Sequence, residues 1–258
     1  MKKLAIASAL LSALAITGTA NAYQAEVGVT AGAVDPDHGS TKGIYGVEGT
    51  AYFKPVQTRN APLAEAAYLD RASNVSAQYN YSKVDDAKLH NYSAGIEYFV
   101  PGTDFYMSGD IGRQDMKFKY APNFDTTLYS AEVGYLPAPG LLVAAGVKGY
   151  HNDNNDRTTP SLRAKYVTEL ANGQDINLEA GTTFGNVHDY NIAADYYLDK
   201  TLSIGADYQK QDLLDNKEWG INARKFINQN ISLEGRVGFA KNDVNDYNTY
   251  SVAAKYRF

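Results

Sequence analysis

Side chains that could do acid–base or nucleophilic chemistry are few in this chain of 258 residues. It has no cysteine, and its four histidines, His38, His90, His151 and His188, all fall in or beside polar segments. No Gly-x-Ser-x-Gly elbow is present to expose a nucleophilic serine. The neighbouring pair His188-Asp189 is what any Asp- and Asn-rich segment gives by chance. The sequence therefore predicts no catalytic residue and no enzyme.

Metal, cofactor and nucleic-acid binding are equally poorly supported. The acidic stretch at residues 153–156 reads Asp-Asn-Asn-Asp and lacks the spacing of a complete calcium loop. We expect a solvated loop there, no metal and no cofactor. The formal net charge of −5, without a basic run, argues against a nucleic-acid binder. Without cysteine the chain has neither a disulfide framework nor a zinc ribbon.

The charged residues that remain follow a different pattern, because many alternate with apolar residues. At the C-terminus Tyr250, Val252 and Tyr256 fall on one face of an extended chain, opposite Lys255 and Arg257. Facing rows of opposite charge in a wet interior would set up a transverse field that selects small polar or charged solutes. The residues predicted to line such an interior are Glu97, Asp110, Glu132, Lys148, Arg163, Lys165, Glu179, Arg224, Glu234, Arg236, Lys255 and Arg257.

The elements that would position these charges are β-strands, since alternation with a period of two recurs along the chain. We predict fourteen strands, at residues 23–34, 42–54, 74–84, 90–100, 105–112, 126–136, 141–150, 161–170, 175–184, 190–198, 202–209, 219–226, 231–240 and 247–258. Helical spacing is almost absent from the same region.

The N-terminal residues have the layout of a secretory signal peptide. Lys2 and Lys3 precede an apolar run that ends in the small-x-small motif at residues 20–22. We expect cleavage after Ala22, so that residues 1–22 are the signal peptide and residues 23–258 form an exported domain. No other apolar run approaches the roughly 18 residues of a spanning helix.

Two features favour a membrane barrel over a soluble β-sandwich. Short turns, such as 101–104 and 137–140, alternate with usually longer segments rich in Asp, Asn and Lys, such as 112–125 and 151–160. Tyr and Phe fall near strand ends, where an amphipathic ring can lie at a membrane interface. Because barrel closure pairs every backbone group in lipid, we predict an all-β fold, a transmembrane antiparallel β-barrel of fourteen strands.

Two motifs resemble known outer-membrane proteins. The terminal strand ends in Phe258 with Tyr256 two positions earlier, and it resembles the signal by which barrel-insertion machinery recognises its clients. The segment Pro62–Tyr81 (PLAEAAYLDRASNVSAQYNY) and the mature start Tyr23-Gln24 are similar to the small outer-membrane porins of Acinetobacter-type bacteria. That resemblance implies a single-chain, fourteen-stranded barrel with a narrow channel.

The predicted function follows from the size of the lumen. Fourteen strands leave less room than the sixteen to eighteen strands of porins with wide aqueous channels. We therefore predict an outer-membrane porin with a narrow channel for passive diffusion of small polar or charged solutes. The alternative is a non-conducting barrel, sealed by its own interior ion pairs, whose loops mediate adhesion or bind partners.

One connection, residues 55–73, breaks the short-turn rule. Pro62, after a capping Asn60, predicts about two helical turns between the second and third strands. One hypothesis is that this helix constricts the periplasmic mouth, and the alternative is an amphipathic helix that rests on the rim. The residues predicted to form the constriction are Leu63, Glu65, Tyr68, Leu69 and Arg71.

We expect the protein in the outer membrane as a monomer, with both termini in the periplasm. Its expected partners are membrane lipid, lipopolysaccharide and small solutes, with Phe258 addressing the insertion machinery.

Overall fold

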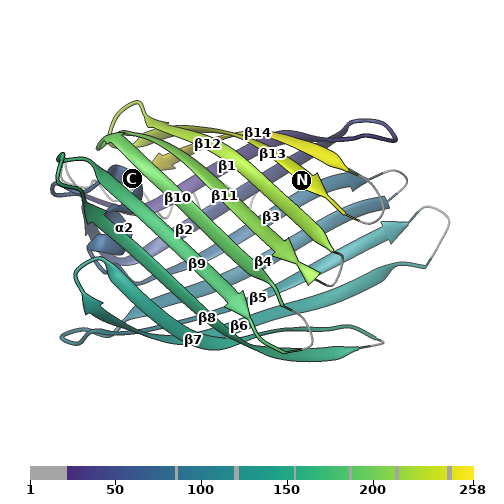
Figure 1. Ribbon diagram of the computed structural model, residues 1–258, viewed down its shortest axis with the longest axis horizontal. Coiled ribbons are helices and arrows are strands. Elements are labelled where there is room, and N and C mark those ends of the chain that lie inside the picture. The colour runs from purple at the N-terminus through teal and green to yellow at the C-terminus, as the bar shows by residue number, and fades with distance from the viewer. Residues whose placement is uncertain are drawn as a thin grey trace, which may run out of the picture.

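The strands of the chain close into a barrel. The computed structural model describes residues 22–84, 87–118, 122–153, 155–185, 188–212, 215–242 and 246–258. Each strand pairs antiparallel with its sequence neighbours, and β1 pairs with β14 to complete the ring (Figure 1). The predicted signal peptide lies outside the described residues except for Ala22, which begins β1.

The fourteen predicted strands are confirmed, with small shifts of their ends. Their bounds are β1 (Ala22–Pro36), β2 (Lys42–Gln57), β3 (Asn74–Val84), β4 (Ala87–Phe99), β5 (Phe105–Phe118), β6 (Phe124–Ala138), β7 (Leu141–His151), β8 (Asp156–Glu169), β9 (Asp175–Thr183), β10 (Tyr190–Asp199), β11 (Leu202–Gln211), β12 (Asn216–Phe226), β13 (Ile231–Lys241) and β14 (Tyr247–Arg257).

The alternation in the sequence becomes an apolar outer face and a polar inner face. Phe105, Val133 and Val252 expose 59%, 66% and 65% of their surface on the outside of the barrel. A soluble protein would bury such side chains, whereas a barrel presents them to lipid. The apolar belt is therefore the protein's membrane-contacting surface.

The polar connections are shorter than predicted. The segment expected as a loop over 112–125 is strand up to Phe118 and again from Phe124, and β8 already begins at Asp156. Lys117 pairs with Lys88, and His151 with Asp156, so the ladders continue through these polar residues. His90, expected beside a loop, lies within β4. Polar residues at a strand end therefore mark where the barrel emerges from the hydrocarbon layer of the membrane. They do not mark the end of the strand, which continues beyond that boundary.

A short helical segment joins β2 to β3, as predicted. It consists of a 3-10 turn, η1 (Leu63–Glu65), followed by α2 (Ala66–Leu69), at the end of the barrel where the C-terminus lies (Figure 1). The prediction that Asn60 caps this helix is wrong. Pro62 holds the N-cap position without a side-chain bond, and the Leu63 N–H donates to the carbonyl of Lys200 at 2.8 Å instead. Among the described residues no helix is long and apolar enough to cross a bilayer.

Buried apolar side chains gather at the same end of the barrel, in two small clusters. One joins Tyr23 and Val56 to Ala66 and Ala72 of the helical connection. The other contains Phe99, Tyr106, Leu136 and Leu142 from four strands, with Tyr68 of α2 against it. The apolar interior is thus small, and both of its clusters include or contact residues of the helical connection.

The turn at Gly140 provides a test of the closeness of this packing. Gly140 has a φ of 73°, and a Cβ there would collide with the carbonyl oxygen of Val167. Gly140→Ala is expected to lower the free energy of unfolding by about 2 kcal/mol or more, since a left-handed conformation costs an L-residue about 1–2 kcal/mol before any clash. Urea unfolding in detergent, followed by heat-shifted gel mobility, measures this loss.

The matched control is Gly173→Ala. Gly173 has a φ of 79°, but nothing lies within 4 Å of a Cβ at that position. This variant should lose only the conformational part, and equal losses in the two variants would contradict the packing described for Gly140.

Candidate functional site: the barrel lumen

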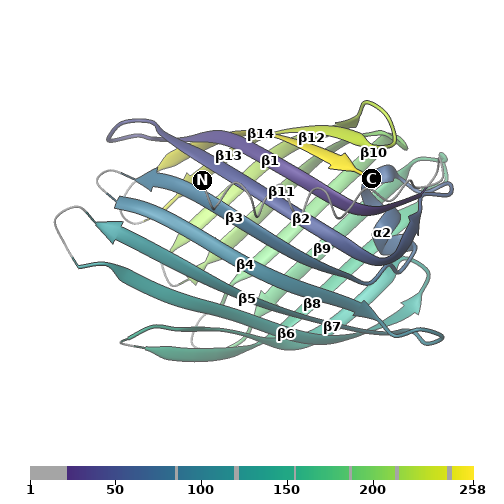
Figure 2. The same cartoon turned by 180° about the vertical axis from the view of Figure 1, so that it is seen from behind.

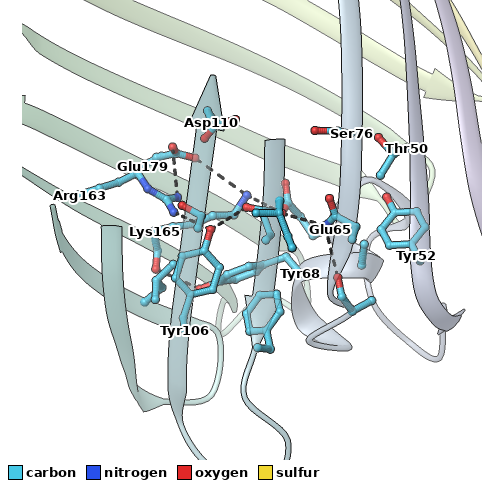
Figure 3. A pocket seen from close by; sticks show the side chains of 18 of the residues that line it. Thr50, Tyr52, Glu65, Tyr68, Ser76, Tyr106, Asp110, Arg163, Lys165 and Glu179 are labelled. Carbon is cyan, nitrogen blue, oxygen red and sulfur yellow. Dashed lines mark hydrogen bonds and ion pairs between the residues drawn. The ribbon is translucent and has the colours of Figure 1, made fainter. Parts of the chain in front are cut away.

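The interior of the barrel holds a cavity of about 730 Å³. Its wall is formed by inward side chains of most strands and by Glu65 and Tyr68 of the helical segment (Figure 3). Eight of the predicted lining residues border this cavity: Glu97, Asp110, Glu132, Lys148, Arg163, Lys165, Glu179 and Arg224. The other four do not border it but form ion pairs inside the barrel: Glu234 pairs with Arg224, while Arg236, Lys255 and Arg257 pair with inward-facing carboxylates.

The two sides of the cavity differ in net charge, although Glu179 on β9 and Asp195 on β10 lie among the basic side chains of the second side. On β2 to β6 its lining includes Glu48, Glu97, Asp110 and Glu132 and, among the described residues, no Lys or Arg. The four basic side chains that line it, Lys148, Arg163, Lys165 and Arg224, come from β7, β8 and β12. The strand order of the closed ring therefore produces a field across the lumen.

Much of this charge is paired between strands that are adjacent in the ring or separated by one strand. Arg163 binds Glu132 through its Nε and Nη2 atoms, and Arg224 lies 2.6 Å from Glu234. Lys255 reaches Glu48 at 2.6 Å. These pairs stiffen the wall and narrow the lumen, because each holds two long side chains in one geometry.

A second group of charges in the cavity has no oppositely charged partner within the part of the chain that the structure describes. Glu97 accepts hydrogen bonds from Asn74 at 3.0 Å and Tyr106 at 2.8 Å, which are neutral side chains. Asp110 accepts one from Ser130 at 3.3 Å. Lys148 faces the same cavity, exposed like Glu97 and Asp110. These three charges remain free to interact with a solute.

The helical segment crosses one end of the cavity. The Glu65 carboxylate lies 2.9 Å from Lys165 Nζ on β8 and accepts a hydrogen bond from the Tyr197 hydroxyl on β10 at 2.8 Å. In Figure 3 Glu65, Tyr68 and Lys165 converge inside the wall. Because β8 lies almost opposite β2 in the ring, a segment that leaves β2 reaches it only by crossing the mouth.

Three further contacts anchor the segment on other sides. The Tyr68 hydroxyl donates to the carbonyl of Gly140 at 3.0 Å, and Arg71 pairs with Asp104 at 2.8 Å. Arg257, on the last strand, donates to the carbonyl of Leu63 at 2.8 Å. Leu63 itself is buried, and Leu69 is half-buried. Four of the five residues predicted for the constriction thus belong to this anchored segment, and Arg71 follows it two residues later.

Two tyrosines were not predicted and prove central to the site. Tyr106 is 2% exposed and joins Glu97 to Arg163, whose Nη2 atom donates to its hydroxyl at 3.2 Å. Tyr197 is equally buried and holds Glu65. The available signal was parity, because each tyrosine occupies an inward position in its strand. The expectation that Tyr and Phe lie at the membrane interface does not distinguish these two inward-facing rings.

No metal centre is present among the described residues. No group of three or more His, Asp or Glu side chains there could hold a metal ion. The acidic stretch 153–156 lies partly outside the described residues, because residue 154 is not among them. The site is therefore a charged cavity bordered at one end by the anchored helical segment.

Comparisons with known proteins identify a matching family and similar structures. Residues 1–158 and 143–258 match the model of a family described as "Putative general bacterial porin". The crystal structure of the Acinetobacter baumannii outer membrane protein Omp33 is similar, with 27% identity, a TM-score of 0.70, and coverage of 93% of this chain and 100% of that one.

More distant structures include the KdgM porin, at 13% identity and a TM-score of 0.46, covering 90% of this chain and 99% of that one. Pseudomonas putida OprB matches at 8% identity and a TM-score of 0.45, covering 92% and 93%. No curated protein matches the sequence.

The anchoring of the helical segment can be tested with Glu65→Ala. The variant removes a charge-assisted contact to Lys165 and a hydrogen bond from Tyr197, bonds worth roughly 1.5–3 kcal/mol when one partner is charged. We expect hydrogen exchange of the backbone amides of Asp70 and Ala72, which are bonded within the segment, to accelerate about tenfold or more.

Glu234→Ala is the matched control, since it removes the partner of Arg224 without touching the segment. Its segment amides should exchange as in the unchanged protein. An unaltered exchange rate in Glu65→Ala would show that the contacts to β8 and β10 do not hold the segment.

Proposed function

The chain belongs to the family of general bacterial porins, and from that premise we propose how its lumen passes solutes. The barrel is an outer-membrane porin with a narrow path for passive diffusion of small polar or charged solutes. Family and fold indicate a channel rather than an enzyme. The observation that carries the proposal is the exposure of Glu97, Asp110 and Lys148 to one cavity without ion-pair partners among the described residues.

These charges favour passage of a solute through the lumen over a lumen that is closed by the protein's own side chains. A solute that crosses the lumen must exchange part of its hydration for contacts with the wall. Glu97 and Asp110 offer acceptors on one side, and Lys148 offers a donor on another. A small solute with both charges, such as an amino acid, can be solvated by both sides at once.

The helical segment supplies the constriction. In the proposed channel η1 and α2 restrict one mouth, and Glu65 presents its charge to Lys165 at the narrow point. The support for this role is the set of anchors that tie the segment to β8, β10 and β14. A helix resting on the rim would not need contacts on strands so far apart in the ring.

A second candidate function is a non-conducting surface barrel. The ion pairs of Arg163, Arg224 and Lys255 favour it, because interior charges that satisfy one another can close a lumen. In that case the exposed polar rim opposite the helical segment would bind partners. Conductance separates the two functions.

The proposed orientation places both termini, and the helical segment, in the periplasm. The carbonyl of Phe258 accepts hydrogen bonds from the backbone of Gln24 and Ala25 at 2.8 and 2.9 Å, so the two described ends of the chain meet at one rim. Phe258 stacks on Tyr256 beside it, which supports its proposed role as the residue that insertion machinery reads. The proposed unit is a monomer.

Single-channel recording tests the channel and its constriction together. The unchanged protein in a planar bilayer should conduct weakly, and deletion of residues 60–72 should raise the conductance at least about twofold, because it removes the obstruction. The double variant E65A/Y68A, which keeps the connection, should show larger current fluctuations.

Lys225→Ala is the control for this experiment. Lys225 contacts the side chains of Asp199 and Thr201 at the same rim. These residues flank Lys200, whose backbone carbonyl Leu63 binds, but neither described contact of Lys225 is to the segment itself. The variant should conduct like the unchanged protein. Absence of current across many insertions would favour the surface barrel. An unchanged conductance in a folded deletion variant would exclude the constriction.

Orientation can be measured because the chain contains no cysteine. Asp153→Cys places a thiol on the rim opposite the helical segment, and Ala171→Cys places one on the rim that carries it; both positions are exposed. A membrane-impermeant maleimide should label Asp153→Cys on intact cells and Ala171→Cys only after lysis. The reverse pattern would overturn the proposed orientation.

A further inference from the structure

Asp110 lies along the inner wall of the barrel, over a glycine. On the neighbouring strands it is directly opposite Gly95 of β4 and Ser130 of β6. Its Oδ2 atom accepts a hydrogen bond from the Ser130 hydroxyl at 3.3 Å. Its Oδ1 atom occupies the space that a Cβ at Gly95 would fill. Because Gly95 has no side chain, the carboxylate can lie against the wall instead of projecting into the lumen.

Asp195 repeats this arrangement on another wall. It is directly opposite Gly205 of β11 and Asn177 of β9. The Asn177 Nδ2 atom donates to its Oδ2 atom at 3.2 Å, and its Oδ1 atom occupies the Cβ space at Gly205. In Figure 2 β5 runs along the near wall of the barrel and β10 along the far wall, and Figure 1 shows the reverse. Two aspartates, each between a neutral donor and a glycine, therefore border one cavity from different sides.

These two carboxylates belong to a surplus of negative charge in the lumen. Of the described residues that border the cavity, seven are Asp or Glu and four are Lys or Arg. Glu48 and Arg224 also have ion-pair partners beyond the border of the cavity, one of each charge, so the surplus remains when these are included. Within the described part of the chain, neither Asp110 nor Asp195 has a Lys or Arg at ion-pair distance. A lumen with such a surplus attracts cations and repels anions.

Other glycines in the strands have different surroundings. Gly109 on β5 and Gly235 on β13 have outward parity, opposite the exposed Ile96 and Val252. A Cβ at Gly109 would come no closer than 3.7 Å to another atom, and one at Gly235 would have nothing within 4 Å. At Gly95 the three atoms nearest to a Cβ all belong to side chains, which can move. A methyl group there is therefore expected to displace the carboxylate into the lumen and leave the strands paired.

We propose that Asp110 and Asp195 make the channel prefer cations to anions. Gly95 and Gly205 are positioning residues in this proposal, because they let the two carboxylates lie against the wall and so keep the path open. The proposal rests on the channel function proposed above and names its solute class: small inorganic cations and organic solutes that carry an ammonium group. Such a solute exchanges part of its hydration for the carboxylate oxygens as it passes. The carboxylates thus determine which charge passes, and the glycines determine how much room it has.

The charge preference is tested with the full chain in a planar bilayer, from the reversal potential in a KCl gradient. The variant D110N/D195N keeps the shape of both side chains and removes their charge. The matched control D115N/D125N removes two carboxylates that pair with Arg113 on the outward parity of β5 and β6. We expect K⁺ to permeate at least about threefold better than Cl⁻ through the unchanged protein and the control, and this ratio to fall at least about twofold in D110N/D195N.

The positioning role is tested by conductance. G95A and G205A should conduct at least about twofold less than the unchanged protein and keep its preference for K⁺, because the carboxylates are displaced but not removed. G109A and G235A, which have room for the methyl group, should conduct normally. G95A/D110A should regain the conductance that G95A loses, since the displaced side chain is gone. Heat-shifted gel mobility verifies that each variant is folded.

The outcomes separate this proposal from the proposed channel. Equal permeation of K⁺ and Cl⁻ through the unchanged protein, or an equal change in D110N/D195N and D115N/D125N, would overturn the selectivity and leave the channel standing. Normal conductance in folded G95A and G205A, or a loss that persists in G95A/D110A, would overturn the positioning role. Absence of current from the unchanged protein would overturn the channel itself, and the selectivity with it.

Discussion

The need to pair every backbone N–H and C=O in a medium without water governs this structure. Lipid offers no substitute partner, so an open sheet edge inside the membrane is untenable. The chain satisfies the requirement by pairing the whole of β14 with residues 26–36 of β1. At the seam the carbonyl of Phe258 accepts two backbone donors, from Gln24 and Ala25. Once the ring is closed, its inner and outer faces are separated, so the outer face can be apolar while the inner face is polar and charged.

The inner face shows how charges behave in a confined, wet space. Arg163, Arg224 and Arg257 each bind a carboxylate on another strand, which keeps buried charges paired. Tyr106 and Tyr197 add neutral hydrogen bonds that orient Glu97 and Glu65. These contacts hold the side chains that line the lumen in defined positions. A barrel of this size has no conventional hydrophobic core, and its two small apolar clusters serve the helical segment.

The fold was largely predictable from the sequence, and the site only in part. A strand with one face in lipid and the other in water requires apolar and polar residues to alternate along its sequence. The alternation from Tyr250 to Phe258 therefore predicts β14 correctly. Polar strand ends do not carry that signal, so Lys117 was assigned to a loop. The pairing of Glu65 with Tyr197, 132 residues apart, depends on the register of the closed ring, which no local pattern encodes. The alternation in the sequence identifies which residues face inward. Their partners in ion pairs and hydrogen bonds are known only from the three-dimensional arrangement.

The contact between Arg257 and Leu63 has a consequence for the order of assembly. Arg257 is the penultimate residue and the last of β14, and it holds both Glu26 on the first strand and the start of the helical segment. A partly assembled barrel, still open between its first and last strands, therefore lacks this anchor. The helical segment has its full set of contacts only when the seam has formed. Completion of the wall and completion of the segment's set of anchors are in this sense one event, linked by the side chain of Arg257.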